Sequence, residues 1–316
     1  MNKLFSKILK WSPFPSLILV VAFIAMAAFM YPYFLTSSYL SGLVGAYMPL
    51  ILLSMGQSIV IIAGGIDVSI GALMTLVNVT IVKLIELGVN PILAFAIGLI
   101  ASLIFGCING FVVTILRVNP LLVTLATSSI AAGAALYIMP SPGGSIPIKY
   151  VLWYSESFVG IPKPVLFMVI LIVIWLLIYL SPIGLQIYSV GENLKMSYVS
   201  GIRVNLVRFV SYIFASLSAG VAGIAVSGSI GSGNSSVGLS LTLMSVAACI
   251  IGGISLNGGI GNIFGAIMGS VFLCLVFNIV ISANVSAYFQ SLLSGGIILV
   301  SIIATAAIKR KKQYSV

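Results

Sequence analysis

Long apolar stretches recur from one end of the chain to the other, and short turns with glycine, proline or charged residues separate them. A helix of roughly 20 residues crosses a hydrocarbon core of about 30 Å, and it satisfies its own backbone polar groups in lipid. The pattern therefore predicts ten membrane-spanning helices. The predicted spans are Ser16 to Phe34, Gly42 to Ala63, Val68 to Leu87, Pro91 to Leu116, Leu121 to Met139, Pro164 to Leu180, Val207 to Ser227, Leu241 to Leu256, Ile260 to Ile281 and Phe289 to Ile308.

The composition agrees with this pattern. Hydrophobic residues make up 61% of the chain and charged residues only 6%, whereas soluble domains carry about 25% charged residues. The predicted fold class is all-α, a polytopic membrane helix bundle that forms a single transmembrane domain over residues 1–316. Two longer polar segments interrupt it, at about residues 140–163 and 182–206.

The basic residues predict the orientation of the bundle, because Lys and Arg accumulate on the cytoplasmic side of membrane proteins. If the N-terminus is cytoplasmic, eleven of the 14 basic residues lie inside. These are Lys3, Lys7, Lys10, Arg117, Lys195, Arg203, Arg208, Lys309, Arg310, Lys311 and Lys312, against Lys83, Lys149 and Lys163 outside. Both termini are therefore predicted in the cytoplasm, and the net charge of +10 requires no nucleic-acid partner.

The sequence offers no pattern for catalysis or cofactor binding. Cys107, Cys249 and Cys274 stand singly, and the chain has no histidine to complete a metal site. A phosphate-binding glycine loop followed by lysine is also absent from the sequence. We expect no enzyme activity, no cofactor and no metal in this chain, so its energy source lies elsewhere.

Asp67 is the one carboxylate predicted near the membrane, in the turn that follows Gly64 and Gly65. The glycines end one span, and the Asp side chain then serves as the N-cap of the next helix, or the break forms part of a gate or subunit contact. Both interpretations can hold together, and a proton-coupling role is a further alternative. Gly252 and Gly253 repeat the motif later in the chain and predict a second helix break or gate.

Neutral polar side chains within the spans are candidates for a translocation path, because hydroxyl and amide groups exchange hydrogen bonds with a passing polar molecule. The alternative for each residue is a hydrogen bond between helices. The candidates are Gln57, Asn78, Asn109, Thr124, Thr127 and Ser128.

Five short motifs occur in an order and spacing that carry a family resemblance. They are Gly64-Gly65-Ile66-Asp67-Val68-Ser69-Ile70-Gly71, Gly106-Cys107-Ile108-Asn109-Gly110, Ile187-Tyr188-Ser189-Val190-Gly191-Glu192-Asn193, Ser200-Gly201-Ile202-Arg203-Val204 and Gly252-Gly253-Ile254-Ser255-Leu256-Asn257-Gly258-Gly259-Ile260-Gly261. In this respect the chain resembles the permease subunits of bacterial ABC importers for ribose and related sugars, including the autoinducer-2 importers.

The resemblance implies a type II-like permease of ten helices in the bacterial inner membrane. It implies a second permease subunit, identical or homologous, cytoplasmic ABC ATPase subunits and an extracytoplasmic substrate-binding protein. The substrate is then a sugar or sugar-like molecule that passes between the two permease subunits, and membrane lipid surrounds them. The segment at about 140–163 contains Trp153, Tyr154 and Glu156, which suits an interfacial helix that either rests at the headgroups or receives the binding protein.

The resemblance also assigns a role to the polar segment at 182–206, where a short coupling helix docks into the ATPase. We expect this helix within Glu192 to Ser200, with Glu192 near its start, Lys195 further along and Gly201 as its stop. The alternative is an amphipathic loop that packs on its own protein. The expected coupling residues are Glu192, Asn193, Leu194, Lys195, Met196, Tyr198, Val199 and Gly201.

Together these observations predict a permease subunit of an ATP-driven sugar importer. The alternative from another class is a stand-alone secondary transporter or facilitator driven by an ion gradient.

Overall fold

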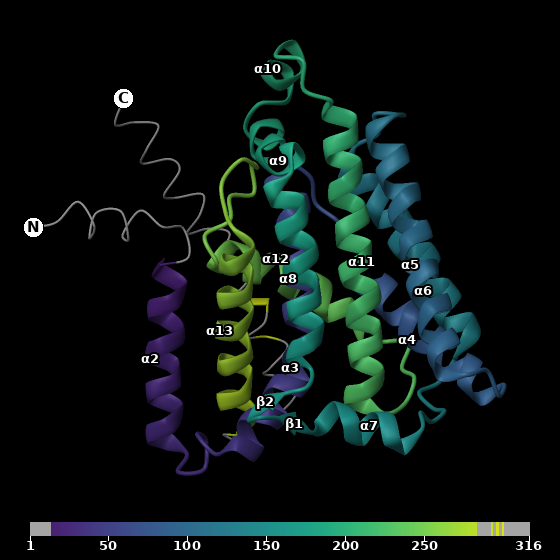
Figure 1. Ribbon diagram of the computed structural model, residues 1–316, viewed down its shortest axis with the longest axis vertical. Helices are drawn as coiled ribbons and strands as arrows, with labels where there is room; N and C mark the ends of the chain where they lie inside the picture. The colour runs from purple at the N-terminus through teal and green to yellow at the C-terminus, as the bar shows by residue number, and fades with distance from the viewer. Residues whose placement is uncertain (1–13, 283–291, 293–294, 297–298, 300–316) are drawn as a thin grey trace, which may run out of the picture.

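Figure 1 shows the computed structural model of the chain, which describes residues 14–282 together with 292, 295–296 and 299. The helices are α2 (Phe14–Met30), α3 (Ser37–Ile62), α4 (Ile70–Glu86), α5 (Pro91–Thr114), α6 (Pro120–Ile138), α7 (Ile148–Ser155), α8 (Val165–Leu180), α9 (Pro182–Glu192), α10 (Leu194–Val199), α11 (Val204–Ile230), α12 (Gly238–Ile251) and α13 (Ile263–Ser282). A two-residue hairpin, β1 (Ser157–Phe158) and β2 (Ile161–Pro162), follows α7.

The long helices lie side by side along one axis of the molecule (Figure 1). The short helix α10 stands at one end, and α7 with the β1–β2 hairpin lies at the other (Figure 1). The bundle therefore has two distinct ends, each with one of the two polar segments predicted from the sequence.

The all-α prediction is confirmed apart from the small hairpin, and nine predicted spans each coincide with a helix to within a few residues. The tenth, Phe289 to Ile308, lies almost wholly outside the described residues, as do the basic residues at both termini. Among the described helices, five are long and apolar enough to cross a membrane, and a sixth span results if α8 and α9, bent by 82°, are taken together. The segments Ser16–Met30 and Gly238–Ile251 are apolar but shorter.

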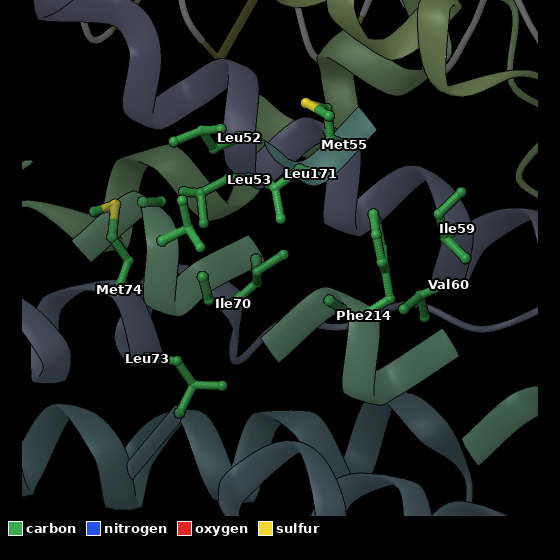
Figure 2. Close-up of a cluster of buried hydrophobic side chains, with 14 of the residues drawn as sticks. Leu52, Leu53, Met55, Ile59, Val60, Ile70, Leu73, Met74, Leu171 and Phe214 are labelled. Carbon is green, nitrogen blue, oxygen red and sulfur yellow. The ribbon is translucent and has the colours of Figure 1, made fainter. Parts of the chain in front are cut away.

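Helix α11 occupies the centre of the bundle and packs against α3, α4 and α5. Figure 2 shows the apolar core at this meeting point, with Leu53 and Ile59 from α3, Leu73 from α4, Leu171 from α8 and Phe214 from α11. All of these side chains are buried. The α3 helix is enclosed by the others over most of its length, since it is buried without interruption from its middle to its end.

Small residues allow these helices to approach closely. A methyl group built on Gly106 of α5 would lie 1.9 Å from Ser216 Oγ of α11, and one on Gly71 of α4 would lie 2.2 Å from the Gly238 carbonyl oxygen of α12. In lipid, helices associate through such close packing, because the surrounding tails are as apolar as the side chains.

Two of the predicted helix breaks end helices in the same way. The amides of Gly64 and Gly65 donate to the carbonyls of Ile61 and Val60 at 2.9 Å, and Gly64 has a φ of +80°. This is the Schellman arrangement, which satisfies the last carbonyls of a helix and favours glycine. Helix α12 ends in the same way, with Gly253 at a φ of +81°, so each glycine pair lies at the end of a helix.

The close contact between α5 and α11 yields a first prediction. Gly106→Val will lower the free energy of unfolding by ~1–3 kcal/mol, because the added side chain overfills the space beside Ser216. Gly133→Val on α6 is the control, since a methyl group there meets no atom within 4 Å. Thermal unfolding of the purified chain in detergent tests the pair, and equal melting temperatures for the two variants would contradict the packing.

Candidate functional site

Helix α10 is a separate short helix with a defined start and stop. The side chain of Asn193 caps it by accepting a hydrogen bond from the Met196 amide at 3.1 Å. At the other end, Gly201 has a φ of +80° and its amide donates to the Tyr198 carbonyl at 3.0 Å. The predicted helix and its glycine stop are therefore present. Glu192, however, is the last residue of α9, so the expectation that it lies at the start of the coupling helix is wrong.

The outward face of α10 is apolar although it projects from the bundle. The exposed fractions are 45% for Leu194, 66% for Met196, 72% for Tyr198 and 82% for Val199, and Lys195 is exposed beside them. Ser197 is the buried residue of this helix, and its hydroxyl donates to the Ser189 carbonyl of α9 at 2.8 Å. The four apolar side chains are therefore largely exposed, and Leu194, Tyr198 and Val199 also line a cleft beside α10.

The end of α9 is joined to the core by a backbone contact that we call the glycine junction, formed by Ile62, Gly191, Gly258 and Gly259. A methyl group built on Gly191 would lie 1.7 Å from the Ile62 carbonyl oxygen and 2.6 Å from the Gly259 nitrogen. The Gly259 amide also donates to the Ile62 carbonyl at 2.9 Å. The junction brings together the end of α3, the end of α9 and the loop between α12 and α13.

Asp67 lies in the turn between α3 and α4, close to this junction in sequence, and is fully buried. Its Oδ1 accepts from the Ser69 amide at 2.8 Å and from the Ser69 hydroxyl at 2.6 Å. Helix α4 begins at Ile70 with Ser69 as its N-cap residue, so the interpretation of Asp67 as the N-cap is wrong. Instead, Asp67 fixes the turn that precedes the helix. Its Oδ2 has no hydrogen-bond partner among the described residues.

A chain of buried hydrogen bonds extends from this turn to α5 and α6. Thr127 of α6 donates to Asn109 Oδ1 at 2.8 Å, and Asn109 of α5 donates to Ser69 Oγ at 2.9 Å. The Ser69 hydroxyl then donates to Asp67. Thr124 reaches the same turn through the Ile66 carbonyl at 3.3 Å. These three predicted path residues, Asn109, Thr124 and Thr127, therefore make contacts between helices.

The other predicted path residues are scattered. Asn78 of α4 donates to Ser227 Oγ at 2.9 Å and to the Ser232 carbonyl at 3.1 Å, and so holds the loop between α11 and α12. Ser128 is half-buried on α6. Gln57 of α3 is fully buried, and neither its Oε1 nor its Nε2 has a hydrogen-bond partner among the described residues. The six candidates thus do not form one lining.

The segment at 140–163 contains the expected helix, α7, and it is anchored to the bundle. Tyr154 donates to the Gly45 carbonyl of α3 at 2.8 Å, and Tyr150 donates to the Ile224 carbonyl of α11 at 3.0 Å. Burial raises the pKa of the Tyr154 phenol, with a smaller contribution from Tyr150, so this donor keeps its proton. Lys163 pairs with Glu156 and lies over the Trp153 ring.

The sequence predictions missed the partners of Gly191. The signal was present in the run Gly258-Gly259, because consecutive glycines indicate a close approach of backbones. Their contact with the end of α3 depends on tertiary packing across 197 residues of sequence, which spacing along the chain does not reveal.

The glycine junction generates a second prediction. Gly191→Ala will separate the end of α9 from α3, because the methyl group collides with the Ile62 carbonyl. Hydrogen–deuterium exchange of the amides in α9 and α10 will become faster by about tenfold, the equivalent of 1.4 kcal/mol of local stability. Gly133→Ala is the matched control, and unchanged exchange in the Gly191→Ala chain would show that the junction does not hold α9.

Comparisons with known proteins agree with this architecture. Residues 39–302 match the family model described as the branched-chain amino acid transport system / permease component. The chain is 30% identical over 307 residues to the D-allose transport system permease protein of Escherichia coli, which covers 95% of this chain and 94% of that protein. It is 31% identical over 256 residues to the ribose import permease protein of Bacillus subtilis, covering 80% of each chain.

The autoinducer 2 import system permease protein of Salmonella typhimurium is 28% identical over 264 residues, covering 81% of this chain and 80% of that protein. No solved structure matches the chain at a significant level. The family model covers most of the sequence, including all the motifs of the α3–α4 turn, α10 and the glycine junction. The chain therefore belongs to this family of transport permease components and is the membrane permease subunit of an ABC importer.

Proposed function

We propose that this chain carries a sugar or sugar-like small molecule across the bacterial inner membrane, as one half of a permease dimer driven by partner ATPases. The substrate class is supported by the names of the relatives, which are permeases for D-allose, ribose and autoinducer 2. ATP hydrolysis takes place in the partner subunits, and this chain is not an enzyme. The second permease subunit is either another copy of this chain or a homologue.

The proposed topology has ten spans with both termini in the cytoplasm. The distribution of charge supports this orientation: Arg117, Lys195 and Arg203 lie at the α10 end of the bundle, while Lys83 and Lys149 belong to the α7 end. Basic residues mark the cytoplasmic side, so α10 faces the cytoplasm and α7 faces outward. The outer segment of α7 and the hairpin then receives the substrate-binding protein.

The single observation that carries the proposed mechanism is the exposed apolar face of α10. A capped helix that holds Leu194, Met196, Tyr198 and Val199 in water gains nothing from them on its own. In a complex, the same face fills a groove on the ATPase. Because α10 is bonded to α9 and α9 meets α3 at the glycine junction, a displacement of α10 by ATPase closure moves the end of α3 directly.

Alternating access then follows from the α3–α4 turn. The turn lies between the glycine junction on one side and the Asp67–Ser69–Asn109 hydrogen bonds on the other. We assign the gate to this turn, with Gly64 and Gly65 as the hinge and Gly252 and Gly253 as the corresponding break in α12. The family does not support the ion-gradient-driven alternative.

Gln57 is the strongest of the six path candidates. A buried amide without partners is rare, because each unsatisfied polar group costs about 1–3 kcal/mol. A hydroxyl-bearing substrate in an opened path would supply both a donor and an acceptor to Gln57.

The coupling role yields a third prediction. Leu194→Asp combined with Tyr198→Asp will abolish retention of the ATPase, because two carboxylates replace the apolar contact face. The measurement is a tagged pull-down from mildly solubilised native membranes with mass spectrometry of the retained proteins. Any second permease in the sample identifies the dimer type.

The matched control is Val159→Asp, an equally exposed apolar residue at the opposite end of the molecule, and it will retain the ATPase. If the double variant keeps the ATPase, or if the parent chain transports without one, the coupling role of α10 is wrong.

The buried amide yields a fourth prediction. Gln57→Met will keep or raise the melting temperature, because it removes two unsatisfied polar atoms from a buried site. Sugar uptake by cells will fall at least tenfold, since the path loses the amide that binds the substrate. A stable variant with unchanged uptake would exclude Gln57 from the path.

A further inference from the structure

A cleft of about 1330 Å³ lies beside α10, between the α5–α6 turn and the first turns of α11. Four basic residues, Arg117, Lys195, Arg203 and Arg208, are among those that line it. They come from three separate parts of the chain: the α5–α6 turn, α10 and the start of α11. The fold thus gathers positive charge in one concave site.

None of the four Asp and Glu side chains of the sequence lines this cleft. Asp67 is buried in its turn, and Glu86 and Glu156 form ion pairs with lysines at the opposite end of the molecule. Glu192 lines a separate cavity between α9 and α10. The cleft therefore has no acidic side chain of this chain in its lining to balance its four cations.

The cleft adjoins apolar surface that faces outward from the bundle. Leu206 of α11, which lines the cleft, is exposed by 43%. Leu116, Leu121 and Leu122, close in sequence to the lining residues Arg117 and Pro120, are exposed by 58%, 44% and 61%. The flanking helices α5 and α6 have the lowest buried fractions of the membrane-span candidates, 22% and 28%. A ligand that fits both surfaces carries an anionic group and long apolar chains.

The turn that presents Arg117 is held in an unusual conformation. Arg117 has a φ of +56°, which non-glycine residues adopt at a cost. The next turn is fixed by Asn119, whose side chain accepts from the Leu121 amide at 2.9 Å. The strained residue is one of the four cations that line the cleft.

We propose that this cleft binds the phosphate headgroup of an anionic phospholipid from the cytoplasmic leaflet. The guanidinium groups of Arg117 and Arg203 bind the phosphate oxygens, for which their paired donors are suited. The acyl chains lie along the exposed leucines of α5 and α6. Basic pockets between spanning helices on the cytoplasmic side bind lipid headgroups in this manner. The assignment to the cytoplasmic leaflet depends on the proposed orientation of the chain. The assignment of an anionic phospholipid does not depend on it.

The test uses the full-length chain in a neutral detergent, with phosphatidylglycerol as the probe and native mass spectrometry to measure retained lipid at increasing concentrations. The Arg117→Gln, Arg203→Gln variant is expected to bind ~25-fold more weakly, about fivefold for each cation removed. The control, Lys83→Gln with Lys149→Gln, removes the same charge at the opposite end and will bind like the parent. Phosphatidylcholine will not bind the cleft, and millimolar inorganic phosphate will not displace the lipid.

Equal affinity in the parent and the Arg117→Gln, Arg203→Gln variant overturns the proposal, provided that both chains melt at the same temperature without lipid. Displacement by inorganic phosphate also overturns it, since the site then takes a free anion. If the variant keeps the lipid but loses the ATPase in the pull-down, the cations serve the protein partner instead. Because the lipid measurement needs no partner subunit, its failure is separate from a failure of the coupling role of α10.

Discussion

The structure depends on how closely helix backbones approach one another in a medium that gives no hydrophobic drive for helices to associate. Lipid tails solvate leucine as well as another helix does, so contact must come from small residues and short hydrogen bonds. Helix α11 meets this requirement by placing Ser216 against Gly106 of α5 and Ser218 against Gly56 of α3. Each of these glycines would collide with its neighbour if it carried a single methyl group. The distances between α11 and its neighbours α3 and α5 therefore require glycine at these positions.

The same constraint shapes the α10 end of the bundle. At the glycine junction, Gly191 allows the backbone of α9 to touch the end of α3, so no flexible side chain separates α9 from the core. On its other side, the α3–α4 turn is bonded to α5 and α6 through Ser69, Asn109 and Thr127. The turn is thus connected both to α9 and to the outer helices α5 and α6.

Much of this could be predicted from the sequence. The lengths of the apolar stretches predicted the helix bounds to within a few residues. Gly64, Gly201 and Gly253 lie at helix ends with positive φ, a backbone conformation that favours glycine and is therefore visible in the sequence. Side-chain roles were less predictable. Asn109 and Thr127 have the chemistry of path residues, yet they bond to each other, since partners on neighbouring helices are set by rotation and packing rather than by spacing. Glu192 was predicted at the start of the coupling helix but is the last residue of α9. The contact of Gly191 with Ile62 and Gly259 joins segments that are far apart in the sequence.

The central claim is that α10 and the end of α3 move as one body relative to α5 and α6. The direct measurement is double electron–electron resonance, which gives the distance between two spin labels in the assembled importer. The three native cysteines are replaced by alanine. One pair joins Ser200, the residue after α10, to Asn257 beside the glycine junction, and the other joins Ser200 to Val118 in the α5–α6 turn. On addition of ATP, the first distance will stay constant and the second will change. A change in the first distance with the second constant would contradict the account, because α10 would then move independently of the core.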